Sequence, residues 1–256
     1  MRIGIAGEMH DWPAAARLGY EYFEANLSAV ASLSEREFSE RKKLPAVTGI
    51  RAEAVNGFFA RGTDLYGSPE AAVRDYCRRA LGRAAELGGK IAVVGSGRAR
   101  AVPEGMPVAE AEERFSGILR IIGDCAAAVG MKAVIEPLNR TECNFINTVS
   151  EAVALCRKTG HASVGVLVDF YHFYVNGETV DELDGAADLL WHAHLARPNP
   201  DRGAPTAEDA ASVAPFAAAL RRIGYAGRLS LECSWPTGFA AGGREALAAV
   251  GAFREI

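Results

Sequence analysis

The stretch KAVIEPLNRTECNFINTVSEAVALCRKTGHASVGVLVDF, residues 132–170, has the pattern of one strand–helix–strand unit. Residues 132–138 and 163–170 are short runs rich in β-branched and other apolar side chains, which predict two buried strands. Residues 148–158 predict a helix between them, and Gly160 follows the helix end. A helical connection of this length is typical of neighbouring parallel strands. The stretch therefore predicts a βαβ unit.

The same alternation continues on both sides of this unit and predicts a single (β/α)8 barrel of the α/β class, one domain over residues 1–256. The length suits this fold, because such barrels typically have about 250 residues. No low-complexity or Pro-rich linker divides the chain. Ser34 and Glu37 have the spacing of a capping box at the start of one helix. The other predicted strands are residues 2–7, 20–26, 50–58, 90–97, 189–196 and 228–235, and the other predicted helices are residues 12–18, 34–44, 69–87, 108–128, 179–189, 207–223 and 243–253.

Four consecutive predicted strands carry, near their ends, side chains suited to binding a metal. They are Glu136 in AVIEP, Asp169 in VGVLVD, His194 in WHAHL and Glu232 in LSLEC. One carboxylate at a strand end is more often a surface residue, but the C-terminal ends of barrel strands converge on one mouth, where four such side chains can share an ion. A charged group inside an apolar strand also costs several kcal/mol unless it is paired or bound to a cation. The sequence therefore predicts one divalent ion, Mn²⁺, Mg²⁺ or Co²⁺ rather than structural Zn²⁺.

Two further histidines lie close to these positions. The alternation in WHAHL places His192 on the same face as His194, so His192 is predicted to support the ligand or to belong to the core. His172 comes three residues after Asp169, just past the strand, where it is predicted to hydrogen-bond a substrate oxygen. A solvent-exposed loop histidine is the alternative at this position.

The composition narrows the classes of partner and compartment. The net charge of −4, from 32 acidic and 28 basic residues, argues against a nucleic acid or an anionic membrane as the main partner. The five cysteines are odd in number and form no CxxC motif, which favours free thiols in a reducing compartment. The chain starts with a strand-like run rather than a signal sequence, and no apolar run approaches about 18 residues. We therefore expect a cytoplasmic protein.

Four segments of the second half carry a family signature, VIEPLNRTECNFINTVSEAVAL, VGVLVDFYHFYVNGE, HAHLARPNPDRGAP and LSLECSW. They resemble the xylose-isomerase-like sugar isomerase and epimerase barrels, a group that includes ketose 3-epimerases, hydroxypyruvate isomerases and inosose dehydratases. The resemblance is strongest over residues 132–236 and weaker over residues 20–105. It implies a small-molecule sugar substrate and a divalent metal, and it is compatible with a homo-oligomer, a dimer or a tetramer.

The resemblance also implies roles for individual residues. Glu136 and Glu232 are then both metal ligands and catalytic acid–base groups, while Asp169 and His194 are ligands only. The substrate-contacting positions of the family match His172, Arg202 and Glu142, with Arg197 as a competitor for the role of Arg202. The segment after the fourth predicted strand, VVGSGRARAVPEG, departs from the usual epimerase sequence, and the loop after the seventh strand is shorter than usual.

The predicted chemistry is proton transfer next to a carbonyl. A divalent ion that chelates a ketose carbonyl and an adjacent hydroxyl stabilises an enediolate, and two glutamates can remove and return the proton. Return to the same carbon gives epimerisation, return to the neighbouring carbon gives aldose–ketose isomerisation, and loss of a β-hydroxyl gives an inosose-type dehydration. The residue types leave these outcomes open.

Two other classes of protein share this fold. A phosphodiester hydrolase like endonuclease IV needs additional histidines at the ends of strands 3 and 4. None of the five histidines lies there; they are His10, His161, His172, His192 and His194. A non-catalytic sugar-binding barrel would not need the complete set of four ligands. The isomerase or epimerase is therefore the preferred hypothesis.

The glycine-rich run Gly95-Ser96-Gly97 is followed by Arg98 and Arg100, a composition that is compatible with a phosphate site. It matches neither a P-loop nor a dinucleotide-binding fingerprint. A tight strand-to-helix turn is the simpler interpretation.

Overall fold

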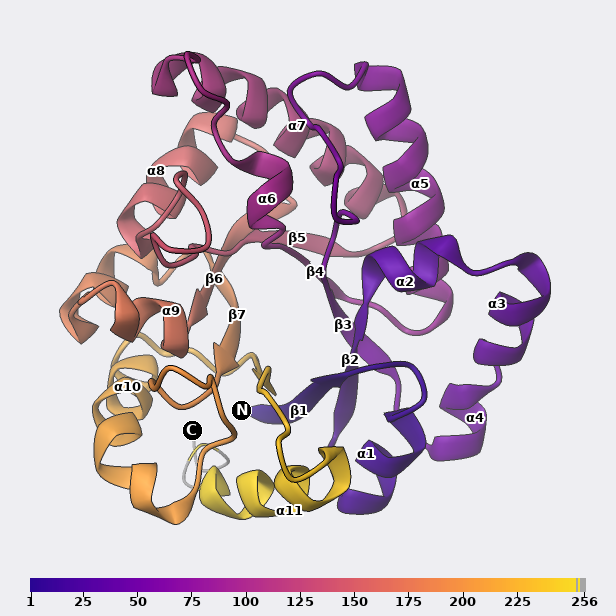
Figure 1. Ribbon diagram of the computed structural model, residues 1–256, viewed down its shortest axis with the longest axis vertical. Coiled ribbons are helices and arrows are strands. Elements are labelled where there is room, and N and C mark those ends of the chain that lie inside the picture. The colour runs from indigo at the N-terminus through magenta and orange to yellow at the C-terminus, as the bar shows by residue number, and fades with distance from the viewer. Residues whose placement is uncertain (252, 254–256) are drawn as a thin grey trace.

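Eight parallel strands close into a barrel in the computed structural model, which describes residues 1–251 and 253. The strands follow one another around the barrel in chain order, and β1 closes the ring by pairing with both β2 and β8 (Figure 1). The predicted (β/α)8 barrel is confirmed. The strands are β1 (Arg2–Gly7), β2 (Tyr22–Asn26), β3 (Ala52–Asn56), β4 (Ile91–Val94), β5 (Lys132–Ile135), β6 (Val164–Asp169), β7 (Leu190–Leu195) and β8 (Arg228–Leu231).

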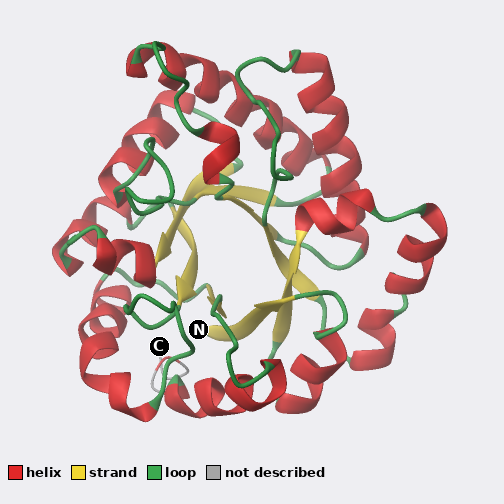
Figure 2. Ribbon diagram, viewed as in Figure 1, coloured by secondary structure: helices red, strands yellow, loops and turns green. Residues whose placement is uncertain are grey.

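Helices surround the barrel on its outer side (Figure 2). They are α1 (Trp12–Leu18), α2 (Leu27–Ser32), α3 (Glu35–Arg41), α4 (Leu44–Thr48), α5 (Glu70–Glu86), α6 (Gly97–Arg100), α7 (Val108–Ala128), α8 (Val149–Thr159), α9 (Phe170–Val175), α10 (Ala210–Arg222) and α11 (Phe239–Ala249), with the 3₁₀-helices η1 (Val180–Ala186) and η2 (Ala207–Asp209). Among the described residues, none of these helices has the length and apolar character needed to cross a membrane.

Local sequence signals account for several helix ends. The capping box predicted for Ser34 and Glu37 is present at the start of α3, and Thr148 with Glu151 forms another at the start of α8. Each pair satisfies backbone N–H groups that have no partner within the helix. Gly160 ends α8 with a φ of 64°, a left-handed conformation that costs other residues more.

The structure differs from the sequence prediction mainly in short elements. The helices α2, α4, α6 and α9 were not predicted, because four to six residues give too short a window for helical periodicity. The helix predicted over residues 179–189 is a 3₁₀-helix. The predicted end of the last helix includes residue 252, which lies outside the described residues.

Several strands are shorter than predicted, and in two of them the difference moves a candidate site residue. β5 ends at Ile135 and β8 at Leu231, so Glu136 and Glu232 each lie one residue past a strand rather than inside it. Their backbone N–H groups still donate to neighbouring strands, at 3.4 Å to the Val94 carbonyl and 3.3 Å to the Leu195 carbonyl. The backbone of both residues is therefore still bonded to the neighbouring strand.

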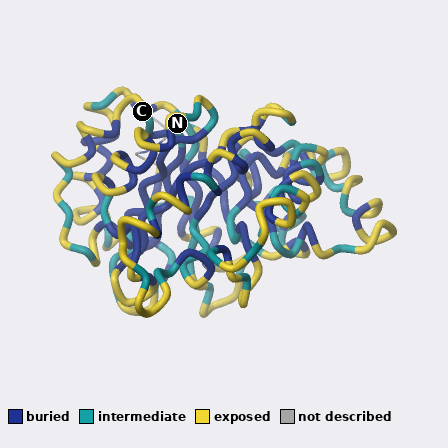
Figure 3. Tube along the Cα trace, turned by 90° about the horizontal axis from the view of Figure 1, so that it is seen from above, coloured by how far each residue is buried: buried dark blue, intermediate teal, exposed yellow. Residues whose placement is uncertain are grey.

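The core has two layers, and the inner one positions the site. Tyr22, Val134 and Leu167 belong to a small apolar cluster inside the barrel, separate from the larger cluster between strands and helices. Gly4 makes room for Tyr22, because a Cβ atom at Gly4 would lie 2.2 Å from the Tyr22 ring. Alternate strand positions face inward, so the residues two places after this apolar layer face the mouth. Figure 3 shows the buried chain at the centre and the exposed chain around it.

Candidate active site

The four predicted metal ligands lie together at the C-terminal mouth of the barrel. Their ligand atoms are all within 4.8 Å of one another. His194 Nδ1 lies 3.3 Å from Glu136 Oε1 and 3.2 Å from Glu232 Oε2. Three of the four residues, Glu136, Asp169 and His194, are buried, and Glu232 is partly buried. We call Glu136, Asp169, His194 and Glu232 the mouth cluster.

The mouth cluster fits a divalent cation. Glu136 Oε1 and His194 Nδ1 are both buried, and neither has a hydrogen-bond partner among the described residues. An unpartnered buried polar atom is costly, and a cation between these atoms would satisfy both. Three carboxylates and one imidazole form a donor set that is typical of hard or intermediate divalent ions.

The electrostatics of His194 agree with this fit. Burial lowers the pKa of His194, but the carboxylates of Glu24 and Glu232 outweigh it and raise this pKa well above its ordinary value. The surroundings therefore favour positive charge at the imidazole. A cation held at Nδ1 would be stabilised by the same carboxylates.

A buried glutamate on β2, Glu24, supports the mouth cluster from inside the barrel. Its two carboxylate oxygens accept hydrogen bonds from His194 Nε2 and His192 Nε2, both at 2.9 Å, and Ser230 Oγ also donates to it. A carboxylate can only accept, so His194 uses Nε2 as the donor and turns Nδ1 toward the mouth cluster. The prediction that His192 belongs to the core or supports the ligand agrees with this position.

Glu24 was missed by the sequence analysis, although a signal for it exists. It stands inside the apolar strand YFEAN, and a charge in such a strand needs a partner. The same argument was applied to Glu136 and Glu232. Applied to every strand, it would have identified Glu24 as a functional candidate but not its two histidine partners.

Arg202 lies over the mouth cluster rather than apart from it. Its Nη2 donates to Asp169 Oδ2 at 2.6 Å and to Glu232 Oε2 at 2.5 Å, and the guanidinium stacks 5.1 Å from the centre of the Tyr171 ring. Its backbone φ is 49°, an uncommon conformation for a residue with a side chain. The competing candidate, Arg197, instead pairs with Asp201 at 3.5 Å.

The two glutamates of the mouth cluster have pKa values displaced in opposite directions. Burial raises the pKa of Glu136, and the nearby Glu232 carboxylate adds to this effect. Burial acts to raise the pKa of Glu232 as well, but Arg202 and His194 outweigh it and lower that pKa to about 2. The mouth cluster therefore contains two glutamates with unlike proton affinities.

His172 and Glu142, the other predicted substrate residues, lie at the edge of the mouth cluster. His172 is buried on α9, and its Nε2 is 3.7 Å from Asp169 Oδ2 without a hydrogen-bond partner among the described residues. Its Nδ1 lies 2.9 Å from Asn139 Nδ2 and 3.9 Å from Glu142 Oε1. The alternative of a solvent-exposed loop histidine is wrong, because α9 folds His172 back against the barrel.

The strands of the first half of the barrel hold the two glutamates in place. Asn56 Nδ2, at the end of β3, donates to Glu232 Oε1 at 2.6 Å. Gly95 follows β4, and a Cβ atom there would lie 1.7 Å from Glu136 Oε2. Arg100 is buried, and it donates to the backbone carbonyls of Val94 at 2.8 Å and Glu136 at 2.7 Å. Arg100 is therefore a structural residue and is not available to bind a phosphate.

A comparison with known families and proteins identifies the family of this chain. The family model of the xylose isomerase-like TIM barrel matches residues 12–256, and the chain belongs to this family. The D-psicose 3-epimerase of Agrobacterium fabrum is 28% identical over 249 residues, which cover 90% of this chain and 83% of that protein. The 3-dehydro-D-guloside 4-epimerase of Escherichia coli is 33% identical over 125 residues, 46% of this chain and 48% of that protein. These relatives support an isomerase or epimerase.

A solved structure shows the same fold over the whole chain. The structure of D-psicose 3-epimerase with D-tagatose from Clostridium cellulolyticum superimposes with a TM-score of 0.81 at 22% identity, covering 100% of this chain and 99% of that one. At this level of identity the likeness concerns the fold alone.

Proposed function

We propose that this protein is a divalent-metal-dependent sugar isomerase or epimerase that acts on a ketose or a related hydroxy-carbonyl compound. The observation that carries the proposal is the mouth cluster, in which the glutamates that follow β5 and β8 both lie close to the same imidazole nitrogen. A Mn²⁺, Mg²⁺ or Co²⁺ ion held by Glu136, Asp169, His194 and Glu232 would polarise the substrate carbonyl and stabilise the enediolate.

The two glutamates then move the proton. Each carboxylate has two oxygens, so one can serve as a ligand while the other reaches the substrate carbon. Glu136 and Glu232 come from strands that are not neighbours in the barrel, which suits removal of a proton on one face of the substrate and return on the other. Return to the same carbon inverts its configuration, and return to the adjacent carbon isomerises the sugar.

The residues around the mouth cluster orient the substrate. His172 Nε2 and the guanidinium of Arg202 lie beside Asp169, where they can donate hydrogen bonds to hydroxyl or carbonyl oxygens. Glu142 offers an acceptor next to His172. An endonuclease IV-like function has less support, since β3 ends at Asn56 and Gly95 follows β4, where that enzyme type needs histidines.

The proposal is tested with the Mn²⁺-loaded protein and a panel of ketoses in D₂O. The wild-type protein should place solvent deuterium on the carbon beside the carbonyl. Glu136→Gln keeps a ligand oxygen but cannot accept the proton, so it should still bind the ketose and lose at least about 10²-fold in kcat. Glu70→Gln, at an exposed position of α5, is the matched control and should behave as wild type.

Three outcomes would contradict the proposal in whole or in part. Product without any solvent deuterium would indicate a direct hydride shift, and the two-glutamate scheme would have to be abandoned. Wild-type turnover in Glu136→Gln would remove Glu136 from the proton transfer. Turnover with loss of water instead of inversion would assign the same site to a dehydratase.

A further inference from the structure

A cavity of about 420 Å³ opens beside the mouth cluster, between the segments that follow β3, β4 and β5. Gly95, whose Cα packs against the Glu136 carboxylate, belongs to its wall, and so does Glu142. The cavity is therefore next to the groups that would carry out the chemistry. Figure 1 shows α6, which contributes to the same wall, at the rim of the barrel near β5.

Two arginines line this cavity, Arg61 from the segment after β3 and Arg98 from α6. Within the described part of the chain, neither forms an ion pair or a hydrogen bond with another side chain or with the backbone. The arginines of the other mouth loops differ in this respect. Arg140 pairs with Glu151, Arg197 with Asp201, and Arg202 with two carboxylates of the mouth cluster.

Hydrogen bonds join the two segments that carry these arginines. The Phe59 backbone N–H donates to Ser96 Oγ at 2.9 Å, and Tyr66 Oη donates to the Arg100 carbonyl at 2.8 Å. The buried guanidinium of Arg100 in turn fixes α6 to the ends of β4 and β5. Arg61 and Arg98 therefore extend from a connected frame, which reduces the conformational entropy lost when both bind one ligand.

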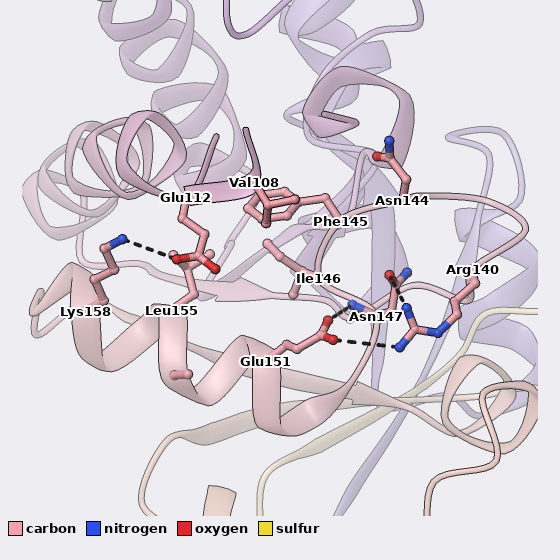
Figure 4. A pocket seen from close by; sticks show the side chains of 11 residues that line it. Val108, Glu112, Arg140, Asn144, Phe145, Ile146, Asn147, Glu151, Leu155 and Lys158 are labelled. Carbon is pink, nitrogen blue, oxygen red and sulfur yellow. Dashed lines mark hydrogen bonds and ion pairs between the residues drawn. The ribbon is translucent and has the colours of Figure 1, made fainter. Parts of the chain in front are cut away.

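A second cavity is lined by charged side chains but has no unpaired arginine among the described residues. It measures about 310 Å³ and lies on the outer side of the barrel, where α7 and α8 meet the segment before α8 (Figure 4). Its charged side chains are already paired, Lys158 with Glu112 at 3.3 Å and Arg140 with Glu151 at 3.8 Å. It therefore has no unmatched charge for a ligand.

We propose that the cavity at Arg61 and Arg98 binds an anionic group of the substrate, a phosphate monoester or a carboxylate, at the end of the molecule remote from the reacting carbonyl. The inference rests on the proposed function for the identity of the molecule as a hydroxy-carbonyl compound. A guanidinium donates paired hydrogen bonds to phosphate and carboxylate oxygens, which suits either anion. Glu142 and the mouth cluster supply negative charge on the side of β5. The anionic end of the substrate is therefore favoured on the side of the two arginines.

The experiment compares matched substrates in the Mn²⁺-loaded protein, D-ribulose with D-ribulose 5-phosphate and D-fructose with D-fructose 6-phosphate, together with a 2-keto sugar acid. Deuterium exchange beside the carbonyl gives kcat/KM for each. The anionic member of at least one pair should exceed its neutral partner by about 10²-fold. Arg61→Ala/Arg98→Ala should abolish this preference and leave kcat/KM for the neutral ketose unchanged, while Arg79→Ala, at an exposed position of α5, should retain it. The acid arm distinguishes a carboxylate from a phosphate.

Binding of inorganic phosphate, measured by calorimetry with the same three proteins, does not depend on turnover. Wild type and Arg79→Ala should bind phosphate, and the double variant should bind it at least about 10-fold more weakly. Exchange of neutral ketoses with no preference for any anion, or phosphate affinity unchanged in the double variant, would overturn the inference and leave the proposed function intact. Absence of exchange with every compound, with phosphate binding that depends on the arginines, would instead overturn the proposed function and keep the anion site.

Discussion

The two halves of the barrel contribute to the site in different ways. All four members of the mouth cluster lie at or directly after the ends of the strands β5 to β8, one for each strand. The strands β2 to β4 supply no member of it, but Glu24, Asn56 and Gly95 on or next to them each contact one member. The second half thus carries the proposed chemistry, and the first half holds it in position.

This division follows from the closed topology. Each of the second four strands delivers an inward side chain at the mouth, while the interior behind these groups is filled by side chains from both halves, Tyr22 together with Val134 and Leu167. Glu24 and His194 are 170 positions apart in the sequence, and they meet because the closed ring places β2 and β7 across one narrow interior. The Glu24 carboxylate is deeply buried and needs these hydrogen-bond partners, because an unpaired carboxylate there would cost several kcal/mol.

The largest effect should come from breaking the second half. Asp169→Asn is the sharpest change, because asparagine is as good an N-cap as aspartate and can keep the bond from the Tyr171 N–H that begins α9. It removes the charge that faces the mouth cluster, and it replaces the Oδ2 acceptor of Arg202 with an amide nitrogen that can only donate. We expect the variant to fold as wild type and to lose its divalent ion at micromolar protein concentration, as measured by elemental analysis after gel filtration.

The control is Asp124→Asn on α7, where the carboxylate is exposed and pairs only with Arg74 and His161 among the described residues. It should retain the ion fully. Full metal content in Asp169→Asn would show that the mouth cluster is not the metal site and would remove the distinction between the two halves.

A smaller but still large effect should come from a change in the first half that replaces none of the four members of the mouth cluster. In Gly95→Ala the new Cβ atom would lie 1.7 Å from Glu136 Oε2, so the carboxylate has to move. A displacement of about 1 Å of a reacting group can lower turnover about 10²-fold. We expect kcat/KM to fall by about that factor in the isomerase assay, with the far-ultraviolet circular dichroism unchanged.

Gly62→Ala is the comparison for Gly95→Ala, because Gly62 is in the segment after β3 and has open space where its Cβ would go, although its φ of 86° strains any residue there. It should cost stability rather than activity. Equal activity in Gly95→Ala and wild type would mean that Glu136 does not depend on the first half for its position.

The sequence predicted the second half of the site much better than the first. Glu136, Asp169, His194 and Glu232 could be found because strand ends converge, so that four positions in the chain give one position in space. Glu24 lies in the middle of a strand, where only the burial of a charge marks it. The role of Gly95 depends on its contact with Glu136, 41 positions further along the chain, and no local sequence pattern indicates that contact.

The fold follows the same rule. Eight strand–helix repeats predicted the barrel, because each repeat is long enough to show its periodicity. The four-residue helix α6 was not predicted, yet it buries Arg100 and leaves Arg98 exposed beside the cavity. A local composition of glycine and arginine cannot separate these two roles, since they differ only in which way each side chain points.

The smallest of these effects should come from Glu24→Gln, and it tests whether the first half acts through the orientation of protons. The carboxylate accepts from His192 and His194 at the same time. A glutamine amide can accept with its oxygen, but its nitrogen must donate, so one histidine has to present a bare Nε2 and carry its proton on Nδ1. If that histidine is His194, the proton faces the mouth cluster and would compete with the proposed ion. Loss of such a supporting carboxylate typically lowers metal affinity about 10- to 100-fold, and we expect a Mn²⁺ affinity about 10-fold weaker by calorimetric titration.

Ser230→Ala, the control, also removes a hydrogen bond to Glu24 but leaves the carboxylate free to accept from both histidines, so its Mn²⁺ affinity should stay close to wild type. Equal affinities in Glu24→Gln and Ser230→Ala would show that metal binding does not depend on the charge of Glu24, and that His194 keeps its proton on Nε2 without it.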